Sequence, residues 1–256
     1  MCVENPMRPV VLALVSCSAV AAAAAVAPSA FATIVLADGE SISLEAIVGA
    51  GGDRSVRIGD QEYFFGVFES HFAASGITLT ARINDTANQF GRFDTGFDLA
   101  GSFSDLLPSN EEPSMMAIGF TVTIVPEAVK NGVRLCDAWM QFDGDASGVG
   151  SYAEVIEHLV APPAEEMIGA LEVYDRVTLE GDELTRRKDA LEFCGPDGFG
   201  AVSSLIVEKT ATFFARPVGG VASASLIEQR FSEVPSPGAL ALAGLAGLIG
   251  YRRPRS

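Results

Sequence analysis

Apolar and polar residues alternate with a period of two in many short segments, and this pattern constrains the fold more than any other feature of the chain. Between residues 77 and 84, the side chains of Ile77, Leu79 and Ala81 alternate with those of threonine and arginine. Such alternation is typical of β-strands that bury one face. It predicts further strands at 117–125 and in the segments that begin at Ser41, Gln61, Val133, Tyr152, Leu171, Ser203 and Val221.

Turns rich in glycine and aspartate separate about ten such segments, and few stretches carry a helical pattern. We therefore expect an all-β fold, an antiparallel β-sandwich. Residues 103–116 are expected to form a surface loop, and residues 161–170 a second break with at most one helical turn. No internal repeat or linker interrupts residues 33–233, which are expected to form one ectodomain.

Residues 1–32 have the features of a secretory signal peptide. Residues 9–32 carry no charge, and Ala30 and Ala32 supply small residues at the two positions that signal peptidase reads. A lipoprotein signal is an alternative because small residues precede Cys17, but the apolar run continues well beyond that cysteine. We expect cleavage after Ala32 and export of the chain.

The chain is strongly acidic, with 33 acidic and 17 basic residues and a net charge of −16. Such a surface repels phosphate backbones and anionic lipids, which argues against nucleic-acid binding. It suits a dispersed exported protein, the binding of cations, or a partner that is neutral or basic.

The four cysteines divide between the signal peptide and the ectodomain. Cys2 and Cys17 lie in the signal peptide, whereas Cys136 and Cys194 lie in the ectodomain. An even pair in an exported domain suggests a disulfide, and a loop of this length would stabilise the fold by about 4 kcal/mol. Two buried free thiols are the alternative.

Motifs of enzymes and of cofactor-binding proteins are scarce. The two histidines, His71 and His158, lie in unrelated contexts, and the chain has no G-x-S-x-G, no phosphate-binding glycine loop and no C-x-x-C. We therefore predict no catalytic residues, no cofactor and no enzymatic activity.

Residues 143–154 match the spacing of a twelve-residue calcium-binding loop, with the turn glycine at Gly148. Oxygen-bearing side chains occupy the first, third, fifth and twelfth positions of this loop: Asp143, Asp145, Ser147 and Glu154. Gly150 stands where such loops have an aliphatic residue, and the chain has no second loop. A hairpin turn is therefore the preferred interpretation, and a calcium site is the alternative.

Residues 234–256 combine three features in a fixed order. A Val-Pro-Ser-Pro box precedes an apolar stretch of 14 residues, 238–251, and arginines follow it. The residues that define the box and the arginine-rich end are Val234, Pro235, Ser236, Pro237, Arg252, Arg253 and Arg255. The apolar stretch is shorter than the roughly 20 residues of an ordinary membrane span, and the arginines would hold its end in the cytoplasm.

This C-terminal segment resembles the PEP-CTERM sorting signal of bacterial exosortase substrates. That signal joins a Val-Pro-Glu-Pro box to a short apolar helix and an arginine-rich end, and Ser236 stands here in place of the usual glutamate. The resemblance implies transient membrane anchoring, processing by an exosortase as well as by signal peptidase, and a final place at the cell surface or outside the cell. A permanent anchor is the alternative.

In the PEP-CTERM family the ectodomain is generally a β-sandwich without an assigned reaction, found in bacteria that make exopolysaccharide and extracellular matrix. The resemblance therefore implies a structural or adhesive role in such a matrix, with exopolysaccharide as a partner. The alternatives are a carbohydrate-binding or glycan-hydrolysing β-sandwich and a calcium-dependent adhesion module.

Two features would distinguish these alternatives. Exposed aromatic residues on one sheet face would favour a carbohydrate binder, whereas two convergent carboxylates with perturbed pKa values in a cleft would favour an enzyme. Trp139, the single tryptophan, lies in a predicted strand and is expected in the core rather than on a sugar-binding surface.

Overall fold

The computed structural model describes residues 33–49, 54–83, 94–105, 112–162, 166–194, 200–216 and 219–235. The predicted signal peptide, residues 1–32, and residues 236–256 lie outside this part. The strands are β1 (Ile34–Leu36), β2 (Ser41–Ser43), β3 (Ser55–Ile58), β4 (Gln61–Ser70), β5 (Thr78–Arg82), β6 (Asp94–Ser104), β7 (Ser114–Ile124), β8 (Val133–Phe142), β9 (Asp145–Ser147), β10 (Tyr152–Ala161), β11 (Glu166–Val177), β12 (Glu183–Arg186), β13 (Lys188–Glu192), β14 (Ser204–Phe214) and β15 (Val221–Pro235). The helices are α1 (Leu44–Val48), α2 (Pro126–Lys130) and the 3-10 helix η1 (Ala74–Gly76).

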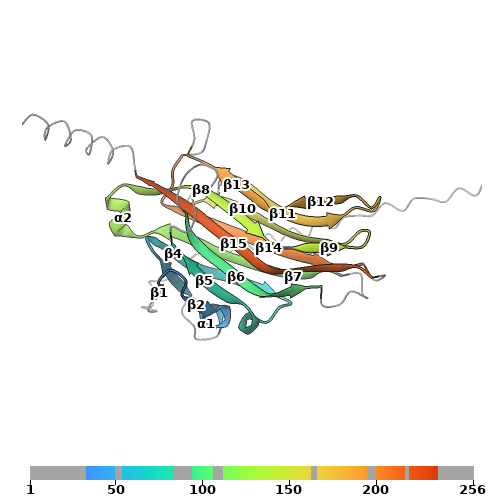
Figure 1. Ribbon diagram of the computed structural model, residues 1–256. Helices are drawn as coiled ribbons and strands as arrows, with labels where there is room; N and C mark the ends of the chain where they lie inside the picture. The colour runs from blue at the N-terminus through green and yellow to red at the C-terminus, as the bar shows by residue number, and fades with distance from the viewer. Residues whose placement is uncertain are drawn as a thin grey trace, which may run out of the picture. The chain divides into compact units, whose positions relative to one another are not determined.

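The strands form two sheets (Figure 1). Sheet A has eight strands in the order β1-β3-β4-β7-β14-β10-β11-β12. Sheet B has seven, in the order β13-β8-β15-β6-β5-β2, with β9 also paired to β15. Within the described ranges, β1 and β3 run parallel and the other neighbouring strands run antiparallel. The predicted antiparallel arrangement is thus wrong only for the short β1.

Aromatic side chains join the two sheets face to face. Tyr63 and Phe120 of sheet A contact Phe97 of sheet B, with ring centroids 5.2 Å apart for Tyr63 and Phe97 and 5.4 Å apart for Phe97 and Phe120. Both pairs meet edge to face, a favoured geometry for aromatic rings. The inward-facing side chains of both sheets belong to one hydrophobic cluster. This is the architecture of a β-sandwich, and it confirms the predicted fold class at that level.

Alternation predicted the longer strands well and the N-terminal part less well. β8 coincides with the predicted strand at 133–142, and β14 lies within the segment that begins at Ser203. The predicted strand from Ser41 is wrong beyond Ser43, because Leu44–Val48 forms α1 and the Ser43 hydroxyl accepts a hydrogen bond from the backbone N–H of Glu45. The predicted break at 161–170 is also wrong in part, since Glu166 begins β11.

The alternation did not predict β6, although this strand lies between β15 and β5 in sheet B. Its outward positions include Asp94, Gly96 and Asp98, and such residues are typical of turns. Gly96 is required by close packing, because a Cβ atom there would lie 2.0 Å from the backbone oxygen of Gln229 in β15. The residues that resemble a turn therefore serve the contact between two neighbouring strands.

Candidate functional site

Three aromatic side chains gather on the outer face of sheet A, where β11, β10 and β14 lie side by side. Tyr174, Tyr152 and Phe214 occupy half-buried positions that alternate with buried core residues along these strands. Tyr152 lies directly opposite Phe214, with ring centroids 5.4 Å apart, and Tyr174 lies opposite Glu154. We call these four residues together with Arg176 the aromatic surface.

Arg176 connects the charged groups of the aromatic surface. Its Nη1 atom lies 3.7 Å from Oε2 of Glu154, and its Nη2 atom lies 3.5 Å from Oε1 of Glu172. The centre of its guanidinium group lies 3.7 Å from the centre of the Tyr174 ring. A planar guanidinium can stack on an aromatic ring while it binds carboxylates through its edge. One arginine therefore holds two carboxylates beside the aromatic rings.

The environment of the aromatic surface raises the pKa of two of its groups. Partial burial raises the pKa of Glu154, the negative charge of Glu172 raises it further, and Arg176 acts in the opposite direction. Burial likewise raises the pKa of Tyr152, to which the charges of Glu154 and Asp105 add. Glu154 therefore takes up a proton at a higher pH than an ordinary glutamate.

A hollow of about 440 Å³ opens at the end of the aromatic surface where β10 begins and β14 ends. Aromatic, charged and hydroxyl-bearing side chains line it together with backbone of the adjoining turns: Gly150, Ser151, Tyr152, Glu154, Arg176, Val177, Thr178, Leu179, Thr212, Phe214 and Arg216. Apolar rings combined with a few placed polar groups are typical of sites that bind small or extended ligands.

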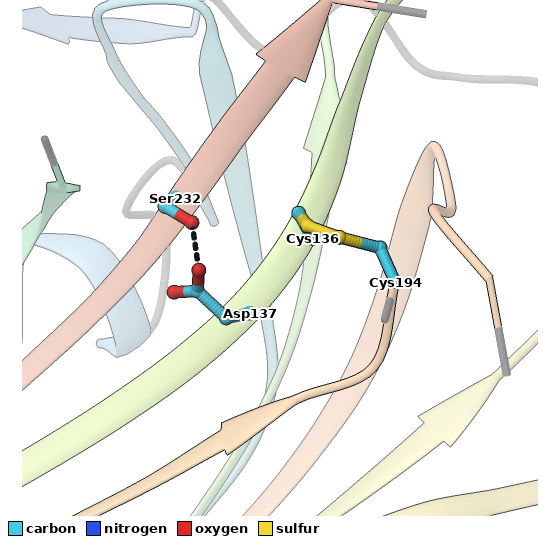
Figure 2. The surroundings of a disulfide bond; sticks show 4 residues. All are labelled: Cys136, Asp137, Cys194 and Ser232. Atoms are coloured by element: carbon cyan, nitrogen blue, oxygen red, sulfur yellow. Dashed lines mark hydrogen bonds between the residues drawn. A yellow bond between two sulfur atoms is a disulfide. The ribbon is translucent and has the colours of Figure 1, made fainter. Parts of the chain in front are cut away.

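The disulfide predicted between Cys136 and Cys194 is present in the structure (Figure 2). The Cα atoms of the two residues lie 4.9 Å apart, within the usual range for disulfides. Beside the bond, the hydroxyl of Ser232 in β15 donates to the carboxylate of Asp137 in β8 (Figure 2). The disulfide therefore attaches the chain after the edge strand β13 to β8.

Residues 143–154 form a strand and a turn rather than a helix–loop–helix unit. Asp145–Ser147 is β9 and pairs with β15 of sheet B. Gly148 and Gly150 have positive φ in the turn that follows, and Glu154 lies in β10 of sheet A, where it faces Arg176. The turn thus joins the two sheets, and the predicted hairpin is wrong in this respect.

Asp143, the first residue of the predicted calcium loop, binds the backbone of β15. Its Oδ1 atom accepts hydrogen bonds from the N–H groups of Ser225 and Leu226 at 2.8 and 2.9 Å. Burial alone would raise the pKa of Asp143, but these bonds and that from the Ser225 hydroxyl lower it. Within the described ranges, one group of three residues brings metal-ligating atoms within 4.8 Å of one another, namely Cys136, Glu192 and Cys194, and its two sulfurs are bonded to each other. Calcium binding by residues 143–154 stays a prediction.

Trp139 does not lie in the core between the sheets, contrary to expectation. Its neighbours Ala138 and Met140 are fully buried in β8, while Trp139 is half-buried on the opposite, outer face of sheet B. Its Nε1–H donates to the carboxylate of Asp94, and the guanidinium of Arg230 lies 5.5 Å from the ring centre. The ring therefore belongs to a polar network and is not an open platform for a sugar.

The predicted sorting segment lies mostly outside the described residues. Val234 and Pro235 are the last residues of β15, paired with Arg134 and Val133 of β8. The predicted domain boundary after Glu233 therefore falls inside a strand. The other motif residues lie outside the described part: Ser236, Pro237, Arg252, Arg253 and Arg255. Within the described part, no helix has the length and apolar character needed to span a membrane.

The sequence did not single out the aromatic surface. The available signal was an aromatic residue at the solvent side of the alternation, as at Tyr152 and Tyr174 in their predicted strands. The pairing of β10 with both β11 and β14 was not visible, because β14 follows β10 only after three other strands. A local pattern identifies the exposed side of a strand but does not identify its neighbours.

No family model matches the chain, and no curated protein matches it. A CBM27 module of Caldicellulosiruptor saccharolyticus, solved in complex with mannohexaose, is 11% identical, with 66% of this chain and 89% of that chain covered and a TM-score of 0.28. A family 11 xylanase of Neocallimastix patriciarum is 7% identical, with 74% and 98% covered and a TM-score of 0.25. A DUF4465 protein of Bacteroides caccae is 11% identical, with 75% and 92% covered and a TM-score of 0.25. No functional conclusion follows from likenesses this distant.

Proposed function

We propose that this protein is an exported, non-catalytic glycan-binding domain that acts at the cell surface or in the extracellular matrix. One observation carries the proposal: Tyr152 and Phe214 lie side by side at a hollow that Glu154 and Arg176 also line. Aromatic faces pack against the C–H faces of sugar rings, while carboxylate and guanidinium groups form strong hydrogen bonds with hydroxyls. The aromatic surface offers both kinds of contact within one concavity.

A neutral polysaccharide is the partner that the charges favour. The chain has a net charge of −16, so an anionic polymer would be repelled at long range. At the aromatic surface, the positive charge of Arg176 is already paired with Glu154 and Glu172. Hydroxyl groups can add to such a pair without displacing either ion.

The position of Arg176 favours binding over hydrolysis. A glycosidase needs two carboxyl groups that flank the bond to be cut, one of them protonated and the other free. Glu172, beside the aromatic surface, is close enough for its charge to raise the pKa of Glu154, but Arg176 pairs with both carboxylates. Because one guanidinium pairs with both carboxylates, this arrangement does not leave them free to flank a glycosidic bond.

The binding proposal is tested with the purified full chain against a panel of neutral polysaccharides, such as mannan, xylan, mixed-linkage glucan and cellulose. Tyr152→Ala and Phe214→Ala are each expected to weaken binding by about tenfold, which corresponds to a loss of about 1.4 kcal/mol. Phe64→Ala is the matched control, because Phe64 is an exposed aromatic residue on β4, which β7 separates from β14.

Three results would contradict the binding proposal. These are no binding to any polysaccharide in the panel, equal losses in the control and the two test variants, and release of soluble sugars by the wild-type chain. The first result contradicts glycan binding, the second contradicts the assigned surface, and the third contradicts a non-catalytic role.

Export and processing by an exosortase form the second part of the proposal, and the two ends of the sequence support it. β15 ends at Pro235, so a cut after this residue would leave the described strands whole. Intact mass of the protein from cells with and without a working exosortase tests this part. Loss of the segment after about residue 235 only in the presence of the enzyme is expected, and a chain that ends at Ser256 in both strains contradicts it.

A further inference from the structure

Lys209 and Glu157 form an ion pair inside the sandwich. They face each other across β14 and β10, on the side of sheet A that packs against sheet B. The Nζ atom of Lys209 lies 2.6 Å from Oε2 of Glu157, and neither side chain exposes any surface. Lysine and glutamate are almost never fully buried, because removal of two charges from water is costly. A buried pair of this kind therefore needs a further explanation.

Gln229 brings a third polar group to the same point from the other sheet. It is fully buried on β15, where it lies opposite Met140 and Phe97. Its Oε1 atom accepts a hydrogen bond from Nζ of Lys209 at 2.7 Å, and its Nε2 atom donates to Oε1 of Glu157 at 3.2 Å. An amine, a carboxamide and a carboxylate from two sheets thus form a closed ring of contacts.

The distances in this ring suit a reaction between the amine and the carboxamide. The carbonyl carbon of Gln229 is one bond from Oε1, so it lies no more than about 3.9 Å from Nζ of Lys209. Reacting atoms held at roughly 3–3.5 Å are close enough for attack, and a small rotation of the carboxamide suffices to reach this range. Glu157 contacts the attacking nitrogen through one oxygen and the leaving nitrogen through the other.

The surroundings favour the nucleophilic form of the lysine. Burial lowers the pKa of Lys209, while the charge of Glu157 and the hydrogen bond to it act in the opposite direction. In an apolar interior, transfer of the proton from ammonium to carboxylate replaces two buried charges by two neutral groups. A neutral buried amine is a much better nucleophile than an ammonium ion.

We propose that Lys209 and Gln229 become joined by an intramolecular isopeptide bond once the sandwich has folded, with Glu157 as the group that transfers protons. Glu157 takes one proton from the ammonium group, and the lone pair of Nζ then forms a bond to the carbonyl carbon of Gln229. Glu157 passes its proton to Nε2 and accepts the second proton from Nζ as the carbon–Nε2 bond breaks. Ammonia leaves, Glu157 ends protonated, and nothing is oxidised or reduced.

The bond would connect β14 of sheet A to β15 of sheet B through the core. The disulfide between Cys136 and Cys194 lies instead at one side of sheet B, so the two covalent links hold different parts of the fold. A cross-link of this kind survives reductants that would open the disulfide. It would make an exported domain resistant to unfolding, and it does not depend on the glycan-binding proposal.

Mass spectrometry of the denatured and reduced full chain tests the inference. The wild-type chain is expected to weigh less than its sequence by one molecule of ammonia, beyond any terminal processing. After trypsin digestion, cleavage at Lys209 should be lost, and because trypsin does not cut between Arg216 and Pro217, Lys209 and Gln229 should be found in one peptide, residues 189–230, that weighs one molecule of ammonia less than its sequence. This linked species localises the loss of ammonia and distinguishes it from loss at a chain terminus.

Two variants distinguish a chemical role of Glu157 from a structural one. Glu157→Gln keeps the size of the side chain but cannot transfer the protons, so the linked peptide should be absent although circular dichroism shows a folded domain. Glu208→Gln is the matched control, because Glu208 neighbours Lys209 on the same strand and is exposed, and the linkage should remain complete.

Persistent linkage in Glu157→Gln would overturn the role of Glu157. Separate peptides and full mass in the folded wild-type chain would overturn the isopeptide bond itself and leave a buried ion pair. If Glu157→Gln fails to fold, wild-type chain recovered in urea from inclusion bodies decides, because chain that has never folded should carry no linkage and the linked form should appear only after refolding.

Discussion

Arg230 and Arg82 contact the same carboxylate, Asp98, from positions that differ in burial. Nη2 of Arg230 lies 2.5 Å from Oδ1 of Asp98, and the Arg230 side chain is 1% exposed. Nε of Arg82 lies 2.8 Å from Oδ2 of Asp98, and this side chain is 37% exposed. Arg230 also donates to the backbone oxygens of Phe97 and Gln229 at 2.6 and 2.9 Å. We predict that removal of the two arginines has very different consequences for stability.

The magnitudes follow from the burial of each arginine. Removal of one partner from a buried ion pair costs about 3–5 kcal/mol, whereas an exposed pair contributes about 0–1 kcal/mol. Asp98 keeps Arg82 when Arg230 is lost, so the cost of Arg230→Met should lie near the lower limit, about 3 kcal/mol. For a domain of this size the melting temperature should fall by roughly 6–12 °C in Arg230→Met and by at most about 4 °C in Arg82→Met.

Urea denaturation followed by circular dichroism, together with calorimetry, measures both effects. Fluorescence is less suitable, because the ring of Trp139 lies 5.5 Å from the Arg230 guanidinium and changes with the mutation. An unchanged slope with urea shows that both variants unfold from the same compact state. Equal losses in the two variants, or a loss below about 1 kcal/mol in Arg230→Met, would refute the reasoning that burial decides the value of these contacts.

Three further predictions concern the disulfide, the aromatic surface and sheet B. Joint replacement of Cys136 and Cys194 by serine should lower the free energy of unfolding by about 4 kcal/mol and remove the effect of reductant, because the bond spans a sequence separation of 58 residues; an unchanged urea midpoint would contradict this. Affinity for glycan should fall as the pH is lowered through the raised pKa of Glu154, whereas the stability that protonated Glu154 provides at low pH should be lost as the pH rises through that pKa. Titration calorimetry should show the change in affinity in the wild-type chain but not in Glu154→Gln. A wild-type affinity that does not change with pH would argue against the assigned role of Glu154. Gly96→Ala should prevent folding, because its Cβ atom would lie 2.0 Å from a backbone oxygen of β15, whereas Gly66→Ala has open space; a soluble Gly96→Ala chain with the wild-type melting temperature would show that the strands can move apart.

The sequence predicted those parts of the fold that local patterns control. Strand β8 was predicted to the residue, and its buried and half-buried positions alternate regularly from Ala138 to Phe142. Strand β6 was not predicted because Asp94, Gly96 and Asp98 have their partners in β8, β15 and β5, far away in the sequence. Trp139 was placed in the core because alternation gives two faces without saying which of them meets the other sheet. The pairing of strands that are distant in the sequence determines the positions of β6 and Trp139, and this pairing cannot be predicted from local patterns in a single sequence.

The residues of the proposed isopeptide site can be recognised only when the sequence pattern and the fold are considered together. Glu157, Lys209 and Gln229 each break the alternation of their strand, since each is a polar residue at a position where its neighbours on the same face are apolar and buried. Taken one at a time, each resembles a residue that has slipped to the wrong face of its strand. The fold brings all three within hydrogen-bond distance of one another, so each side chain provides polar partners for the other two. Functional sites are expected where a residue type does not suit its position in the fold. Three such residues in mutual contact are stronger evidence for a functional site than one such residue alone.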